Sequence, residues 1–298
     1  MYRLGCVSGG EMLDISEPAV EVRLSQGAIR YRDAGAGEPI VFVHGLLVGG
    51  SVWRKVAPLL ADEFRCVVPD WPMGSHRIAM SADADLSALG MARLVADFLA
   101  ALGLDRVTLV GSDTGGGICQ LVATRHPKRV GRLVLTNCDA CDDFPPFPFK
   151  GTPQLMRVPG AGALIAHSFR IAAVRRVGAR LLTKYGIPDE VLDSWARPGF
   201  EDRNVRRDTI KLVRSLSPRL TREALEQLRD FDRPTLLAWA PEDRFFKLRN
   251  AERLAAAIPN SRLELIRDSK AFTQEDQPER LAELIRSFVG LQPVGEAG

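Results

Sequence analysis

Short apolar segments alternate with amphipathic ones along most of the chain. Near its start, two segments alternate apolar and polar residues at every second position and predict an edge hairpin, 19–24 and 28–32. Later segments are short, continuously apolar and rich in β-branched residues, which is typical of strands buried on both faces of a parallel sheet. These segments are 40–43, 66–69, 107–110, 133–136, 235–239 and 263–266.

Apolar residues at helical spacing occupy the stretches between these strands. They predict helices at 51–62, 86–102, 115–126, 248–258 and 278–290. Strands that alternate with helices in this way are usually joined into a parallel sheet with helices packed on it. The sequence therefore predicts a three-layer α/β fold, with a mostly parallel sheet and helices on both faces.

The alternation stops after the sixth predicted strand. Residues 141–153 are crowded with proline and aromatic side chains and predict an irregular linker. From residue 144 to about residue 228 the pattern is helical, and the sheet pattern resumes at 235. We therefore expect a helical cap at 144–228, inserted between the two parts of a core domain at 1–143 and 229–298. The cap holds 15 basic and 8 acidic residues, a net charge of +7, although such charges are more often solvated helix faces than a substrate site.

Composition narrows the classes of function. The net charge of the whole chain is +3, which is too small to indicate nucleic acid binding. No apolar run approaches the length of a membrane span, and the first residues lack the apolar region of a signal peptide. The five cysteines show no metal-binding pattern and indicate reduced thiols. We expect a cytoplasmic protein, monomer or homodimer, that acts on a small molecule without metal, cofactor, nucleic acid or membrane.

A kink follows the strand predicted at 107–110, in the stretch "VTLVGSDTGGGICQ". A nucleophile placed on a strained strand-to-helix turn needs small residues two positions before and two positions after it. Asp113 has Gly111 and Gly115 at these positions, whereas the neighbouring Ser112 has a valine and a threonine. The spacing therefore favours Asp113 as the nucleophile and Ser112 as a neighbour in the pocket. The alternative is a glycine-rich turn in which the aspartate only caps the helix.

A second turn, His44-Gly45, follows the strand predicted at 40–43. A glycine there lets the chain turn so that a backbone N–H faces the kink. The N–H groups of Leu46 and Thr114 would then form an oxyanion hole, with His44 and Gly45 lining the substrate pocket.

Asp243, in "WAPEDRF", follows another buried strand. It would lie at the carboxyl end of the sheet, where catalytic groups gather in open α/β sheets. The alternative is a surface turn, because Pro-Glu-Asp is common turn chemistry.

Together these motifs resemble the α/β-hydrolase superfamily over nearly the whole chain: HG at 44–45, GSDTGG at 111–116, the cap, and "WAPEDRF" at 239–245. The aspartate at the elbow is similar to that of haloalkane dehalogenases and epoxide hydrolases. The resemblance implies an α/β-hydrolase fold and a hydrolase in which Asp113 attacks a small, mainly apolar ester, halide or epoxide. It also implies that Asp243 orients a histidine that activates water.

The chain departs from this family at the histidine itself. When "RDSKAFTQEDQPERL" is aligned on Phe272 and Pro278, the histidine position holds Ala271. An engineered replacement and an inherited gap both fit the sequence. Of the four histidines, His76 follows the fourth strand and is the candidate substitute base, although a surface loop histidine is the commoner reading.

Other departures leave the activity open. Haloalkane dehalogenases usually have a tryptophan after the nucleophile, where this chain has Thr114, and epoxide hydrolases usually have two cap tyrosines, where it has one, Tyr185. A hydrolase centred on Asp113 is therefore one hypothesis. The alternatives on the same scaffold are a non-hydrolytic enzyme, such as a lyase, isomerase or cyclase of secondary metabolism, and a ligand-binding protein.

Overall fold

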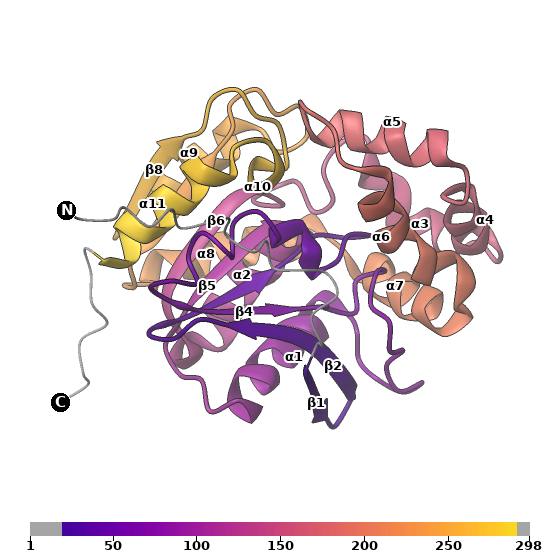
Figure 1. Ribbon diagram of the computed structural model, residues 1–298, viewed down its shortest axis with the longest axis horizontal. Helices are drawn as coiled ribbons and strands as arrows, with labels where there is room; N and C mark the ends of the chain where they lie inside the picture. The colour runs from indigo at the N-terminus through magenta and orange to yellow at the C-terminus, as the bar shows by residue number, and fades with distance from the viewer. Residues whose placement is uncertain (1–19, 291–298) are drawn as a thin grey trace, which may run out of the picture.

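A computed structural model describes residues 20–290 and contains the predicted parallel sheet, with an antiparallel hairpin at one edge (Figure 1). The sheet has eight strands in the order β1-β2-β4-β3-β5-β6-β7-β8. Only the β1–β2 and β2–β4 pairs are antiparallel. The strands are β1 (Val20–Leu24), β2 (Gly27–Ala34), β3 (Pro39–Val43), β4 (Arg65–Pro69), β5 (Val107–Asp113), β6 (Val130–Cys138), β7 (Thr235–Trp239) and β8 (Ser261–Leu265).

The central strands form the core, as their apolar sequences predict. Every residue of β6 and β7 is buried, and so are all residues of β5 except Asp113 at its end. Strand β8 is the exception to the expectation of burial on both faces, because it lies at the edge of the sheet and has no neighbour beyond it. Its residues are only half-buried or exposed.

Helices cover both faces of this sheet. On one face α1 (Ala88–Ala101), α2 (Thr114–Arg125), α8 (Pro218–Gln227) and α9 (Leu248–Ala257) pack side by side in that order. On the other face lie the 3-10 helix η1 (Gly50–Trp53), α10 (Thr273–Asp276) and α11 (Pro278–Gly290). Short 3-10 turns, η2 (Pro127–Arg129), η3 (Phe149–Gly151) and η4 (Leu228–Asp230), connect other elements. The predicted three-layer fold is confirmed.

The helix predicted at 51–62 is wrong in detail. The chain forms η1 and then a series of turns up to Phe64, in which hydrogen bonds to the third and fourth preceding residues alternate. Pro58 lies within this stretch and has no backbone N–H, so a regular ladder of helical hydrogen bonds cannot run through it. The apolar spacing is still used, because Val52, Trp53, Val56 and Leu60 are all buried.

The helical insertion after β6 forms a separate lobe, at the right of Figure 1. It contains α3 (Thr152–Leu155), α4 (Ala161–Ser168), α5 (Ala172–Leu182), α6 (Asp189–Glu201) and α7 (Arg203–Ser215). These helices pack mainly on one another, whereas α8 packs on α2 and α9 of the core. Within residues 20–290, no helix combines the length and apolar character needed to cross a bilayer.

The turn from β5 into α2 depends on close backbone packing. A Cβ added to Gly115 would lie 2.2 Å from the carbonyl oxygen of His44 and 2.4 Å from that of Val43. Both atoms belong to the backbone at the end of a central strand, so they have little freedom to move. Only glycine therefore lets α2 begin this close to β3.

We predict that Gly115→Ala destabilises the protein by about 2–4 kcal/mol, because the added methyl group overlaps main-chain atoms of a buried strand. Gly178→Ala is a matched control, since no atom lies within 4 Å of its added Cβ in helix α5. That change should stabilise the protein by about 0.5–1 kcal/mol through helix propensity. Urea unfolding of both variants measures the difference, and equal stabilities would contradict the packing argument.

Candidate active site

Asp113 lies at the tip of the turn between β5 and α2. Its backbone has φ 55° and ψ −135°, a conformation that costs energy for a residue with a side chain. Its carboxylate accepts a hydrogen bond from the backbone N–H of Thr114, and the backbone N–H of Leu46 lies close enough to lower its pKa. The pKa of Asp113 is raised to about 6, because burial and the nearby charge of Asp243 together outweigh the lowering effect of the N–H groups of Thr114 and Leu46. The predicted oxyanion donors and the predicted nucleophile therefore face one another.

The turn at 44–45 brings the backbone against this carboxylate. A Cβ added to Gly45 would lie 2.5 Å from the Cβ of Asp113, so a side chain has no room there. The backbone N–H of Trp71 donates to Nε2 of His44 at 2.8 Å, and Nδ1 faces the carbonyl oxygen of Gly45 at 2.9 Å. Burial lowers the pKa of His44 to about 4, so the ring is neutral. Both nitrogens hold the turn in place.

Asp243 is buried at the end of β7 and is held by several donors. Asn137 Nδ2 donates to its Oδ2 at 2.9 Å, and the backbone N–H groups of Phe245 and Phe246 donate to it at 2.8 and 3.2 Å. Asn137 also bonds to both backbone groups of Ala240, at 2.7 and 3.1 Å. Burial raises the pKa of Asp243, and these donors oppose the shift. These donors hold the carboxylate in a fixed position, close enough for its charge to act on Asp113.

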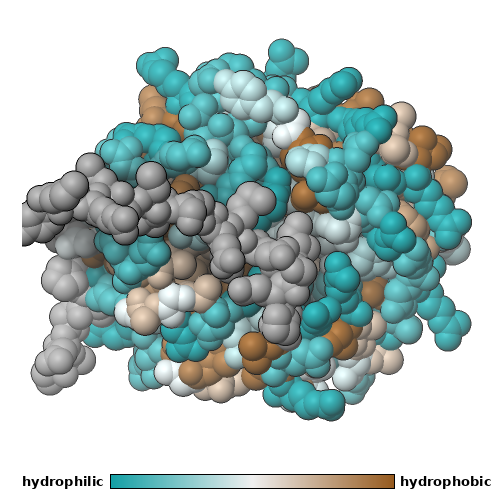
Figure 2. Space-filling view, in the orientation of Figure 1, coloured by the Kyte–Doolittle hydropathy of each residue, from teal (hydrophilic) through white to brown (hydrophobic). Residues whose placement is uncertain are grey.

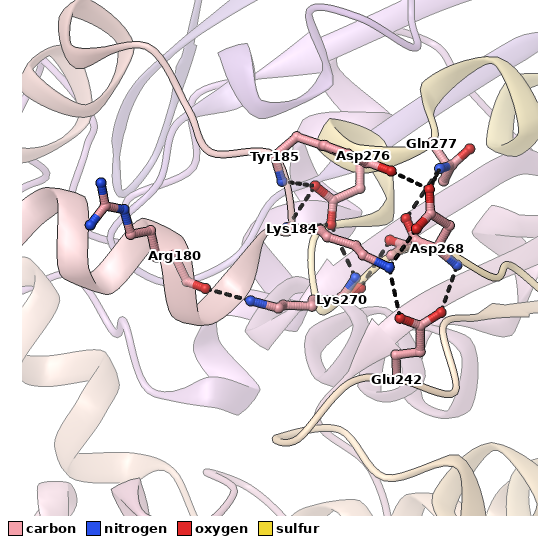
Figure 3. Close-up of polar contacts among 9 residues, drawn as sticks. Arg180, Lys184, Tyr185, Glu242, Asp268, Lys270, Asp276 and Gln277 are labelled. Atoms are coloured by element: carbon pink, nitrogen blue, oxygen red, sulfur yellow. Dashed lines mark hydrogen bonds and ion pairs between the residues drawn. The ribbon is translucent and has the colours of Figure 1, made fainter.

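Ala271, which the sequence predicts at the histidine position of the family, is completely buried. The loop around it is fixed by Asp276, whose carboxylate accepts from the backbone N–H groups of Lys184, Tyr185 and Lys270 (Figure 3). The backbone N–H of Phe272 donates to the carbonyl of Leu182 at 3.0 Å. Backbone contacts to the cap therefore determine the shape of this loop.

Charged side chains strengthen this connection between cap and core. Lys184 in the cap pairs with Glu242, at 3.1 Å, and with Asp268 (Figure 3). The hydroxyl of Tyr185 donates to Asp268, and Lys270 Nζ donates to the carbonyl of Arg180 at 2.6 Å. The loops that carry positions 243 and 271 are thus joined to the end of α5. Because the ion pairs are partly exposed, we ascribe to them orientation rather than large stability.

His76, the candidate substitute base, contacts the cap. Its Nε2 lies 3.3 Å from Oδ2 of Asp208 on α7, and its Nδ1 accepts from the backbone N–H of Gly74 at 3.4 Å. Asp208 also accepts from Met80 and Arg207, and its hydrogen bonds hold its pKa below the usual value despite burial. Within the described part of the chain, no hydrogen bond joins His76 to Asp113. Both ring nitrogens are engaged elsewhere.

Ser112, which precedes Asp113 in the turn, forms a hydrogen bond with a neighbouring side chain. Its side chain is fully buried, and Nε2 of Gln274 donates to its Oγ at 3.2 Å. Gln274 follows the loop of position 271, so this bond links the elbow to that loop. Such an arrangement suits a structural contact better than an exposed nucleophile.

Asp139 is a buried carboxyl that the sequence interpretation missed. Thr114 Oγ1 donates to its Oδ2 at 3.1 Å, and its backbone N–H donates to the carbonyl of Asp113 at 3.2 Å. Its Oδ1 has no protein partner, and burial with the nearby Asp113 raises its pKa well above the usual value. Asp139 directly follows β6, so the reasoning that selected Asp243 at the end of β7 would have found it.

Comparisons with known proteins agree on one fold family. A family model for the alpha/beta hydrolase fold matches residues 38–278. Haloalkane dehalogenase 2 of Mycobacterium tuberculosis is 30% identical over 272 residues, which cover 88% of this chain and 91% of the relative. A 2-hydroxy-6-oxononadienedioate/2-hydroxy-6-oxononatrienedioate hydrolase of Pseudomonas putida is 28% identical over 293 residues, which cover 93% and 99%. A crystal structure of a DbjA mutant superposes with a TM-score of 0.77 at 20% identity, over 92% of this chain and 98% of that one.

The raised pKa of Asp113 has a consequence for stability. Its folded-state value of about 6 exceeds the ordinary 3.8, so the folded protein binds this proton more tightly and loses stability as pH rises through that window. We predict that Asp113→Asn stabilises the protein by about 1–3 kcal/mol at about pH 7.5, and by much less at about pH 4. Urea unfolding at both pH values measures this.

The exposed carboxylate of Asp62 offers a matched control. Asp62→Asn should leave stability nearly unchanged at both pH values, because a surface substitution away from special features costs little. A stabilisation by Asp113→Asn that does not depend on pH would contradict the assignment of a buried, titrating carboxylate.

Proposed function

Because the chain belongs to the α/β-hydrolase fold family and is a hydrolase by that membership, we propose that Asp113 is its nucleophile, acting on a small, mainly apolar ester, halide or epoxide. The observation that carries this proposal is the partly buried Asp113 carboxylate on a strained turn, close to the N–H groups of Leu46 and Thr114. Strain at an element junction is typical of functional positions. A named relative at 30% identity, haloalkane dehalogenase 2, supports a halide or a similar electrophile.

In the first step, an oxygen of the Asp113 carboxylate attacks an electrophilic carbon of the substrate. A bond forms between that oxygen and the carbon, and the leaving group departs with the electron pair of its own bond. With a pKa of about 6, Asp113 is mostly ionised at neutral pH and ready to attack. Burial makes this carboxylate a better nucleophile, because little water needs to be removed from it.

In the second step, water attacks the carbonyl carbon of the resulting ester. Negative charge develops on the carbonyl oxygen, which the N–H groups of Leu46 and Thr114 stabilise. Collapse of this intermediate releases the alcohol and restores the carboxylate of Asp113. The attacking water passes its proton to solvent water, and we propose that the negative charge of Asp243 favours this release.

The residue that would accept the proton from the attacking water is the point at which we propose that this chain differs from its family. Ala271 has no titratable group, and His76 would have to leave Gly74 or Asp208 before accepting a proton. Loss of a general base slows the step that it serves by about 10²–10⁴. We therefore propose that attack by Asp113 is faster than hydrolysis of the ester, so that the ester accumulates.

The cap completes the proposed site. We propose that α3 to α7 close over Asp113 as a lid domain, within the predicted cap of residues 144–228, and that α8 serves the core. The contacts of Lys184 and Tyr185 with the loop of Ala271 support this assignment, because they place the end of α5 beside the catalytic loops. Leu46, half-buried beside Asp113, would then face the substrate from the core side.

A second candidate has its own supporting observation. The buried Ala271 and the occupied nitrogens of His76 leave no imidazole for ester hydrolysis. A lyase, isomerase or cyclase needs no such step, and neither does a ligand-binding protein. Under either alternative Asp113 would orient or protonate the ligand and would form no ester.

We predict that incubation with alkyl halides or epoxides adds to the protein the mass of the alkyl group of a halide, or of the whole molecule of an epoxide, and that digestion places the added group on Asp113. The rate of addition should rise through about pH 6, because only the ionised carboxylate attacks. Ala271→His should clear the adduct at least about tenfold faster, since it restores an imidazole at the family position. Intact-protein mass spectrometry follows both changes.

Asp113→Asn is the control for addition, because the amide retains the shape of the carboxylate but is a poor nucleophile. It should form no adduct. If ligands bind to the unsubstituted protein and no adduct forms in it or in Ala271→His, the covalent mechanism is wrong for that panel, and non-hydrolytic catalysis or binding takes its place.

A further inference from the structure

Exposed apolar side chains are concentrated in the cap. Of the 14 large apolar side chains that are exposed in residues 20–290, seven lie between residues 155 and 185, in α3 to α5 and their loops. We call this segment the outer cap face. Figure 2 shows brown side chains near the right-hand edge of the molecule, over these helices and among teal ones. The seven residues are Leu155, Val158, Leu164, Ile171, Val177, Leu181 and Tyr185.

Packing within the cap leaves this face open to solvent. Helix α4 packs on α6 and α7, α5 packs on α6, and α3 packs on α7. Figure 1 shows α5 along the top of the cap and α4 at its right-hand edge. Leu164 on α4 is 75% exposed and Val177 on α5 is 57% exposed, values that are unusual for large apolar side chains.

The charges on the outer cap face have a single sign. No aspartate or glutamate occurs between residues 144 and 188, whereas residues 155–185 contain six lysines and arginines. Three of these cations pair with carboxylates from other segments of the described chain, namely Arg175, Arg176 and Lys184. Arg157, Arg170 and Arg180 have no carboxylate partner among residues 20–290.

A groove of about 380 Å³ continues this surface between the α3–α4 loop and α7. Its apolar side includes Met156, Val158 and Ile210. Its other side carries cations, of which Arg203, Arg206, Lys211 and Arg214 have no carboxylate partner in the described chain. Arg206, Lys211 and Arg214 donate to backbone carbonyls, so their charges are held in place without being neutralised by a carboxylate. An apolar surface bordered by such cations is complementary to an amphiphile with an anionic head.

We propose that the outer cap face binds the surface of an anionic phospholipid bilayer. Its exposed apolar side chains would enter the boundary between headgroups and acyl chains, while Arg157, Arg180 and the groove cations contact lipid phosphates. Surface-lying amphipathic helices combine cations with exposed apolar residues in this way. No helix needs to span the bilayer, so the absence of an apolar run of that length does not bear on this mode of binding.

Two other occupants fit this face less well. A second copy of the chain would bring the same cations, without any carboxylate from residues 144–188, against the first in a symmetric contact, and like charges repel. Nucleic acid would satisfy the cations but would leave exposed side chains such as Leu164 and Ile171 without apolar partners. The bilayer satisfies both kinds of side chain. The proposal is independent of the assignment of Asp113.

Co-sedimentation of the full chain with vesicles tests this proposal. The two vesicle types are phosphatidylcholine alone and phosphatidylcholine mixed with phosphatidylglycerol. We expect binding to the mixed vesicles at least about tenfold tighter than to the neutral ones, and weaker binding as salt screens the cations. Equal binding to both types, or binding to neither, would overturn the proposal.

Paired variants identify the surface that binds. Arg157→Gln with Arg180→Gln should weaken binding to the mixed vesicles by roughly tenfold or more, since each cation near an anionic surface contributes a few-fold. Arg93→Gln with Arg249→Gln is the matched control, because both arginines are exposed on core helices without a carboxylate partner in residues 20–290. This control should bind like the unsubstituted protein.

The apolar contribution is tested in the same way. Leu164→Gln with Leu181→Gln should weaken binding to the mixed vesicles without changing the fold, because both side chains are exposed. Leu89→Gln with Leu265→Gln is the matched control, because both leucines are exposed on the core. This pair should leave binding to the mixed vesicles unchanged. Equal losses for cap and core pairs would overturn the assignment of this face, as would a cap-dependent dimer in light scattering that persists when vesicles are absent.

Discussion

The site depends on one interaction, between the buried carboxylate of Asp113 and the backbone N–H groups of Leu46 and Thr114. A buried charge needs compensating dipoles, and no lysine or arginine forms an ion pair with Asp113 in the described chain. The two backbone donors lie in the turn after β3 and at the start of α2, so this compensation requires the ends of β3 and β5 to lie side by side. Gly45 and Gly115 make this approach sterically possible. Burial still raises the pKa of Asp113 to about 6, so this compensation is only partial.

Much of this arrangement was readable in the sequence. The strands of the core were predicted within a few residues, because continuous β-branched runs at 107–110 and 235–239 have few other stable environments. The helix at 51–62 was wrong because its apolar spacing outweighed Pro58 in the interpretation. The exposure of β8 was missed because the order of strands in the sheet, and hence the identity of the edge strand, is not a local property of the sequence.

In the proposed site, too, features set by neighbouring residues could be predicted from the sequence, and features set by contacts between distant residues could not. The glycine spacing around Asp113 is local, so the elbow could be located from a few residues. Asn137 and Asp139 escaped notice because their importance comes from contacts with Asp243 and Thr114, which are distant in sequence or lie on another element. The partner of His76, Asp208, is 132 positions away in the cap, and no spacing rule connects the two.

The loop around Ala271 bears on both the fold and the proposed hydrolysis of the ester. The loop that carries a histidine in similar enzymes is here fixed by Asp276 to the backbone of residues 184 and 185, and alanine lies buried within it. Under the proposed function, the chain combines the nucleophile Asp113 and its backbone donors with a buried acid, Asp243, but places no histidine at position 271. Such a combination would separate formation of an ester from its hydrolysis.

The most direct test of the central claim is single-turnover hydrolysis in water enriched in the heavy oxygen isotope. If Asp113 is the nucleophile, the alcohol product takes its oxygen from the unlabelled carboxylate, and mass spectrometry of the peptide that contains Asp113 finds the heavy oxygen there. If water attacks the substrate directly, the label appears in the product and Asp113 remains unlabelled, which would contradict the account.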